Sequence, residues 1–185
     1  TSTSALCSVL YAMADQPEWQ ERLMAEVDAL DTERLTHDHL DQMHDTALVI
    51  QEALRMYPPL GLMPRYALKS FDYKGFTIPA NAACVVSSLF THYMEEYWSD
   101  PYRFDPERFS PERAEDKKHF FQYIPFGGGA HKCLGLHFAQ VQGKIFLHHF
   151  FKRFRVSKSP GQKFKYNNVP LTFPTNGLPL TVTPR

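Results

Sequence analysis

The ten residues from Phe126 to Gly135, with the sequence FGGGAHKCLG, constrain this chain more than any other segment. Their three consecutive glycines permit backbone conformations that other residues avoid, and they leave room for a bulky group beside the main chain. The apolar residues that follow recur at helical spacing, so Cys133 is expected at the start of a helix. Unpaired N–H groups and the helix dipole favour a thiolate there. The segment therefore predicts a reactive thiolate, which can act as a nucleophile or as a metal ligand.

Helical spacing of apolar residues covers much of the chain. We expect an apolar helix over residues 1–14, followed by a second helix that is capped by Asp15 and runs to about Leu30. An amphipathic helix is predicted over 43–57, where two prolines stop it. A further helix is predicted over about 134–153. One face of this last helix carries Leu134, Phe138, Val141 and Ile145.

Short, partly alternating segments between turn residues indicate strands elsewhere in the chain. Residues 66–78 and 83–89 are expected to form a small antiparallel sheet, and the tail after Val156 is expected to form hairpins. Residues 99–125 are rich in Pro, Phe and charge, and irregular segments of this length are usually functional. The expected fold class is mainly α with small antiparallel β-sheets.

The composition argues against several classes of function. The chain has 20 basic and 20 acidic residues, so its charge gives no support to a nucleic-acid partner. Its three cysteines, Cys7, Cys84 and Cys133, are odd in number and far apart, which argues against a disulfide framework or a paired-cysteine metal site. No apolar run is long enough to cross a bilayer. The chain also begins at Thr1 inside an expected helix, so we expect it to be part of a larger fold.

The glycine loop closely resembles the haem-binding signature of the cytochrome P450 monooxygenases, Phe-x-x-Gly-x-Arg-x-Cys-x-Gly. Phe126, Gly129, Cys133 and Gly135 match its fixed positions, and His131 stands where most members have Arg. A His at this position is similar to the sterol demethylase branch and to some bacterial members. The resemblance covers essentially all 185 residues, and it implies that the chain is the C-terminal, haem-binding part of a single P450 domain.

Two further motifs follow in the family's order. Glu52 and Arg55 in QEALRMYPP resemble the Glu-x-x-Arg motif, and FDPERF at 104–109 resembles the Pro-x-Arg-Phe segment, with Arg108 as its arginine. The resemblance implies that these three charges form a buried network with a structural role. The spacing of Glu52 and Arg55 on one helix is also that of a surface ion pair, which would stabilise the fold little.

The resemblance implies a haem b cofactor with Cys133 as the axial ligand of the iron. A thiolate in that position favours O–O cleavage and the insertion of one oxygen atom from O2 into an organic substrate. The resemblance also implies that His131 and Arg65 bond the haem propionates, and plain exposure to solvent is the alternative for both side chains. The remaining haem contacts that it implies are Phe126, Gly129 and Gly135.

The first residues resemble the hydroxyl pair that closes the family's oxygen-activation motif. On this resemblance, Thr1 is expected to help deliver protons to bound oxygen. Thr3 or Ser4 fits the same role equally well, so the residues leave the choice of hydroxyl open.

Two loops, at 60–63 and 169–172, resemble those that usually face the substrate in the family. They contain Leu60, Met63 and Val169, whose apolar side chains suit a small lipophilic molecule or simple packing. The resemblance further implies O2 and a ferredoxin or flavoprotein reductase as partners. The loop sequence is most similar to soluble bacterial members, which implies a cytoplasmic protein; any membrane anchor would lie outside these residues.

Two other functions stay open from the sequence. A nucleophilic enzyme built on Cys133 and His131 would need a base and an orienting group within reach, and two residues of separation is poor geometry for a pair. A truncated or degenerate fragment of the same fold would have a binding or structural role without catalysis.

Overall fold

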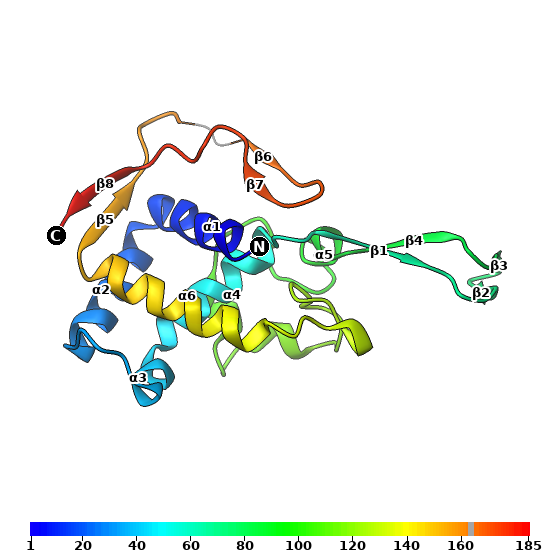
Figure 1. Cartoon of the computed structure of the whole chain (residues 1–185), viewed down its shortest axis with the longest axis horizontal. Coiled ribbons are helices and arrows are strands. Elements are labelled where there is room, and N and C mark those ends of the chain that lie inside the picture. The colour runs from blue at the N-terminus through cyan, green and yellow to red at the C-terminus, as the bar shows by residue number, and fades with distance from the viewer. Residues whose placement is uncertain (163–164) are drawn as a thin grey trace.

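Helices α1 (Ser2–Asp15), α2 (Pro17–Leu30), α4 (His44–Met56) and α6 (Leu136–Phe151) form the body of the computed structural model, which describes residues 1–162 and 165–185. In Figure 1, α6 runs across the front of α4, and α1 lies above both. Each helix contributes apolar side chains to a shared core. The periodicity predicted the core face of α2 and α4, whereas the face predicted for α6, with Phe138, Val141 and Ile145, is exposed. Core side chains include Val9, Met13, Leu23, Val27, Val49, Ala53, Leu147 and Phe151.

The start of α2 differs from the expectation at Asp15. This residue ends α1, and Gln16 takes the N-cap position of α2 without a side-chain capping bond. Pro17 does occupy the first turn, where its missing N–H costs nothing. Buried Gln20 then ties the helix to the main chains of α1 and of the tail, so tertiary hydrogen bonds replace the predicted cap. The Asp15 carboxylate pairs with Lys158 instead.

The single sheet expected over 66–78 and 83–89 is two separate ladders. Strand β1 (Leu62–Tyr66) pairs antiparallel with β4 (Ala83–Ser87), so the first strand begins earlier than expected. Between them, β2 (Phe71–Tyr73) and β3 (Phe76–Ile78) form their own hairpin. Lys74 and Gly75, with φ of 47° and 83°, close that hairpin locally, which separates it from the first ladder.

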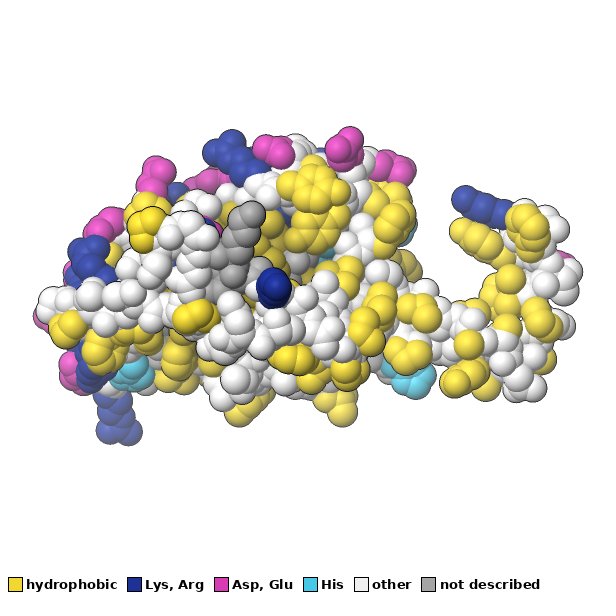
Figure 2. All heavy atoms as spheres, turned by 90° about the horizontal axis from the view of Figure 1, so that it is seen from above, with side chains coloured by type: hydrophobic (Ala, Val, Ile, Leu, Met, Phe, Trp, Pro, Cys, Tyr) yellow, Lys and Arg dark blue, Asp and Glu magenta, His cyan; other side chains and the backbone are white. Residues whose placement is uncertain are grey.

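The two ladders form an arm that projects from the helical body (Figure 1). Viewed from above in Figure 2, the tip stands apart and carries many hydrophobic side chains. Leu68 is 92% exposed and Phe76 is 72% exposed, which agrees with their place near the tip. In the part of the chain that the structure describes, no helix has the length and apolar character needed to cross a membrane.

The tail forms two more antiparallel ladders, in agreement with the expected hairpin-like segments. Strand β5 (Phe154–Ser157) pairs with β8 (Thr181–Pro184), and β6 (Tyr166–Asn167) pairs with β7 (Phe173–Pro174). The shorter elements are α3 (His37–Gln42), α5 (Ser88–Thr91) and the 3-10 turns η1 (Pro106–Phe109), η2 (Glu115–Lys117) and η3 (Gly129–His131). The fold is thus mainly helical with small antiparallel ladders, as the sequence predicted.

Candidate functional site

The glycine loop closes on itself immediately before α6. The Cys133 N–H donates to the carbonyl of Phe126 at 2.9 Å, and the Gly127 N–H donates to the carbonyl of Ile124 at 3.0 Å. Gly127 and Gly129 have φ of 71° and 67°, a left-handed conformation that glycine adopts without strain. The loop therefore places the exposed Cys133 just before the first turn of the helix, as expected.

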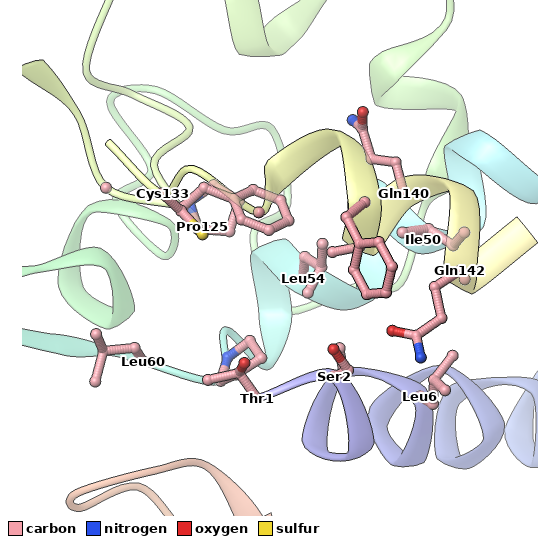
Figure 3. Close-up of a pocket in the computed structure, with 18 of the residues that line it drawn as sticks. Thr1, Ser2, Leu6, Ile50, Leu54, Leu60, Pro125, Cys133, Gln140 and Gln142 are labelled. Atoms are coloured by element: carbon pink, nitrogen blue, oxygen red, sulfur yellow. The ribbon is translucent and has the colours of Figure 1, made fainter. Parts of the chain in front are cut away.

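A cavity of about 570 Å³ lies in front of this cysteine, within the size range of cofactor and small-molecule sites. Figure 3 shows Cys133 and Pro125 on one side of the cavity, and Thr1 with Ser2 and Leu6 of α1 on the other. Residues from α4 and α6 complete a mainly apolar lining. The cavity thus brings together the start of the chain and residues up to Gly143, which are far apart in the sequence.

Most of the site residues expected from the sequence contribute to this cavity. The residues that line it are Thr1, Leu60, Met63, Arg65, Phe126, His131, Cys133 and Gly135. Two of the residues expected to contact haem or substrate are not part of the lining. Gly129 turns the loop with a φ of 67°, and the Val169 side chain is 58% exposed on the tail. The structure therefore gives Gly129 a conformational role and leaves Val169 away from this cavity.

The structure separates the three hydroxyls that the sequence left open. Thr1 lines the cavity, together with Ser2 beside it. The Ser4 hydroxyl instead donates to the carbonyl of Thr172 in the tail. Thr3 is exposed and is not part of the lining. Thr1 and Ser2 thus place hydroxyl residues at the cavity wall, whereas Thr3 and Ser4 do not.

A buried cluster of charges lies behind the loop. Both carboxylate oxygens of Glu52 accept from Arg55, at 2.7 and 2.9 Å, and one of them also accepts from Arg108 Nε at 3.1 Å. The Asp105 N–H adds a fourth hydrogen bond at 2.9 Å. The side chains of Glu52, Arg55 and Arg108 are fully buried, so this is a desolvated network and not a surface pair.

The sequence did not reveal the second carboxylate of this cluster. Glu115 accepts from Arg108 at 3.0 Å, so two buried guanidinium groups face two carboxylates. Burial alone would raise the pKa of Glu115, but hydrogen bonds from Ser99 and Arg113 outweigh it and hold that pKa at about 2. Glu115 lies in an irregular segment with no periodicity, so only the folded path of the chain brings it to Arg108.

Several wall residues were also missed as site residues. Ala5 and Val9 come from α1, Ile50 and Leu54 come from α4, and Phe138 comes from α6. Their helical spacing marked them as apolar faces, but a face can meet the core or a cavity equally well. The sequence therefore identifies the apolar faces but does not tell whether a face packs in the core or lines a cavity.

The Cys-nucleophile alternative gains no support from the geometry. Among residues 1–162 and 165–185, no side chain forms a hydrogen bond with the Cys133 thiol. His131 lines the same cavity and is exposed, and no described residue forms a hydrogen bond with its side chain. A nucleophile of this type needs a base in hydrogen-bond reach, and the loop does not provide one.

Known proteins resemble the chain in both sequence and fold. The family model described as Cytochrome P450 matches residues 1–182. A Mycobacterium tuberculosis relative assigned to cytochrome P450 136 is 33% identical over the whole chain and 38% of its own length. Taxane 13-alpha-hydroxylase of Taxus cuspidata is 34% identical over the whole chain and 39% of its own length. The chain thus spans about two fifths of the length of these relatives.

A solved structure gives the same result for the fold. The structure titled "Retinoic acid bound cyanobacterial CYP120A1" superposes with a TM-score of 0.93 and 30% sequence identity, covering 100% of this chain and 42% of that one. Family match, sequence identity and fold agree with the Cys loop and the buried charges described above. This chain belongs to the cytochrome P450 family.

Proposed function

We propose that this chain supplies the haem-binding part of a P450 domain that inserts one oxygen atom from O2 into a small lipophilic substrate. The observation that carries the proposal is the position of Cys133, whose loop opens onto a cavity with the hydroxyl of Thr1 on the opposite wall. A separate ferredoxin or flavoprotein reductase would supply the electrons, as family membership implies.

The residues at the cavity fit a haem. One exposed thiolate sulfur is the donor expected when a macrocycle supplies the other ligands of an iron. Gly127 and Gly135 line the cavity without side chains, which leaves its loop side open to a flat ring. Arg65 and His131 provide polar donors in a mainly apolar lining, where they would bond the two propionates.

Each remaining group has a simple role in this arrangement. A bound haem supplies the activation of dioxygen and the oxidation of a C–H bond. Cys133 would donate electron density from its sulfur to the iron. Thr1 would hold a proton at its hydroxyl oxygen, opposite the thiolate. Leu60 and Met63 would exclude water and hold the substrate by apolar contact.

The apolar lining favours a lipophilic substrate. The names of two relatives refer to taxane and taurochenodeoxycholic compounds, and the solved P450 structure holds retinoic acid. These are different molecules, so they support a chemical class and not one substrate. We therefore propose a lipophilic organic molecule, with its identity left to experiment.

The carbon monoxide difference spectrum tests this function. Chain loaded with haem, reduced and exposed to carbon monoxide should show the red-shifted Soret band of thiolate-ligated haem. Cys133→Ser should lose that band, whereas the matched control Cys84→Ser should keep it. Because the Cys133 side chain is exposed, the substitution should change the free energy of unfolding by less than about 0.5 kcal/mol.

Two results would count against the proposal. Equal bands in the wild type and in Cys133→Ser would assign the ligand elsewhere. Absence of haem uptake by the folded chain would favour the alternative of a non-catalytic fragment of the fold.

A further inference from the structure

Residues 122–124 lead directly into the glycine loop, and each of them is held by the scaffold. The side chain of Gln122 donates to two main-chain carbonyls at 2.9 and 2.6 Å. The Tyr123 hydroxyl donates to a carbonyl of α4 at 3.0 Å. The N–H of Ile124 donates to the ring Nε2 of His92 at 3.0 Å. The loop therefore starts from a fixed point, although the loop itself is largely exposed.

His92 is fully buried, and its two ring nitrogens have different partners. Nδ1 lies 2.9 Å from the carbonyl oxygen of Arg55, which can only accept. Nε2 faces the Ile124 N–H, which can only donate. The proton must therefore be on Nδ1, and the ring must be neutral. Burial lowers the pKa of His92 to about 4, in agreement with a neutral ring at physiological pH.

The ring is also tied to the buried charge cluster. Arg55 Nη1 donates to the main-chain carbonyl of His92 at 2.7 Å, so each side chain bonds the main chain of the other residue. The Tyr123 ring stacks on the His92 ring at 5.5 Å, which restricts rotation of the imidazole. His92 thus connects the ion-pair helix α4 with the segment that precedes the loop.

A continuous series of hydrogen bonds leads from this ring to the cysteine. Ile124 bonds His92 through its N–H and accepts from the Gly127 N–H through its carbonyl, each at 3.0 Å. In the same peptide unit as the Gly127 N–H, the carbonyl of Phe126 accepts from the Cys133 N–H at 2.9 Å. The main chain between Ile124 and Phe126 is short, so the anchor at Ile124 fixes the carbonyl that holds the cysteine amide.

We propose that His92 is a positioning residue for the Cys133 thiolate, and that it acts through the hydrogen bond from Ile124. The part of this proposal that concerns iron binding by the thiolate rests on the proposed function. The positioning of the loop by His92 does not depend on haem. His92 would link the rigid buried charge cluster to the glycine loop. The link would restrict the conformations of this loop, which its three glycines make flexible.

Three substitutions of His92 separate the effect of its hydrogen bond with Ile124 from the effect of its hydrogen bond with Arg55. Gln is long enough to present an oxygen near the Nε2 position, so His92→Gln keeps an acceptor for Ile124. Asn presents an N–H near the Nδ1 position, so His92→Asn keeps only the bond to Arg55. His92→Phe loses both bonds and retains an aromatic ring against Tyr123. Tyr93→Phe is the matched control, since it removes a 2.8 Å hydrogen bond to the end of α4 without touching residues 122–124.

Hydrogen–deuterium exchange of the haem-free chain is the first measurement. Loss of the Ile124 bond should speed exchange of the peptide 124–133 by about tenfold in His92→Asn and His92→Phe. Exchange in His92→Gln and Tyr93→Phe should stay close to the wild type. If His92→Phe does not fold, the comparison of Gln with Asn decides. Equal exchange of this peptide in the Gln and Asn variants would overturn the proposal.

The fraction of thiolate-ligated haem is the second measurement. After haem addition, the red-shifted carbon monoxide band should be retained in His92→Gln and reduced in His92→Asn. A reduced band in both variants, or in neither, would show that the Ile124 bond does not position the thiolate. If the wild type takes up no haem, the proposed function fails, and the exchange measurement still decides the role of His92.

Discussion

Replacing Glu52 by Gln tests whether the buried charge cluster stabilises the fold. The substitution keeps the shape of the side chain but removes its charge, and its new NH2 group faces N–H donors of Arg55. At present Glu52 and Glu115 balance Arg55 and Arg108, so the variant would leave one uncompensated positive charge in a fully buried site. Removing one partner of a buried pair costs about 3–5 kcal/mol, against a total stability of about 5–15 kcal/mol.

Urea unfolding followed by circular dichroism measures this loss. With a slope of about 2–3 kcal/mol per molar urea, the midpoint should fall by about 1–2.5 M. Glu107→Gln is the matched control, because its carboxylate pairs with Arg22 at 2.6 Å and both side chains are about two fifths exposed. That pair should be worth about 1 kcal/mol or less. A loss in Glu52→Gln no larger than in Glu107→Gln would refute the reasoning.

Three further predictions follow from other contacts. Between about pH 6.5 and pH 4 the unfolded chain binds a proton at His92 that the folded chain does not, because burial lowers the folded pKa to about 4. Stability should thus fall by about 3 kcal/mol as the pH falls through that window in urea titrations, and His92→Gln should remove this dependence. Gly129→Ala should cost about 1 kcal/mol, because φ is 67° and no atom lies within 4 Å of the added Cβ; Gly129→Asn should cost less in the same assay. Thr172→Val leaves the Pro58 carbonyl without its 2.7 Å hydrogen bond, so stability should fall by about 1–3 kcal/mol and tail amides should exchange faster.

The helices and the thiolate loop could be predicted because their signals are local. Apolar periodicity located α1, α4 and α6, and the glycine loop identified Cys133 without knowledge of the fold. The N-cap of α2 was predicted wrongly at Asp15, because capping preferences describe a helix start in isolation. In the structure the preceding helix continues through Asp15, and buried Gln20 holds the next one.

Contacts that follow no helix or strand spacing could not be predicted in the same way. Glu115 reaches Arg108 only because the irregular segment folds back, and no spacing rule describes that path. The apolar face of α6 is a second example. Leu134 and Phe138 are 103% and 68% exposed, whereas Leu147 and Phe151 on another face are buried in the core. Periodicity identifies a face that is apolar, but it does not identify what covers that face.

The glycine motif alone does not fix the conformation of the Cys133 loop, because residues outside the loop hold it in place. A run of three glycines loses more conformational entropy on ordering than any other tripeptide, so the loop resists a single conformation. Few contacts within the loop oppose that cost, since most of its side chains are exposed. The order must therefore come from both ends, where α6 begins on one side and His92 holds Ile124 on the other. Because His92 in turn bonds Arg55, a structural ion-pair motif far away in sequence bears on the position of Cys133.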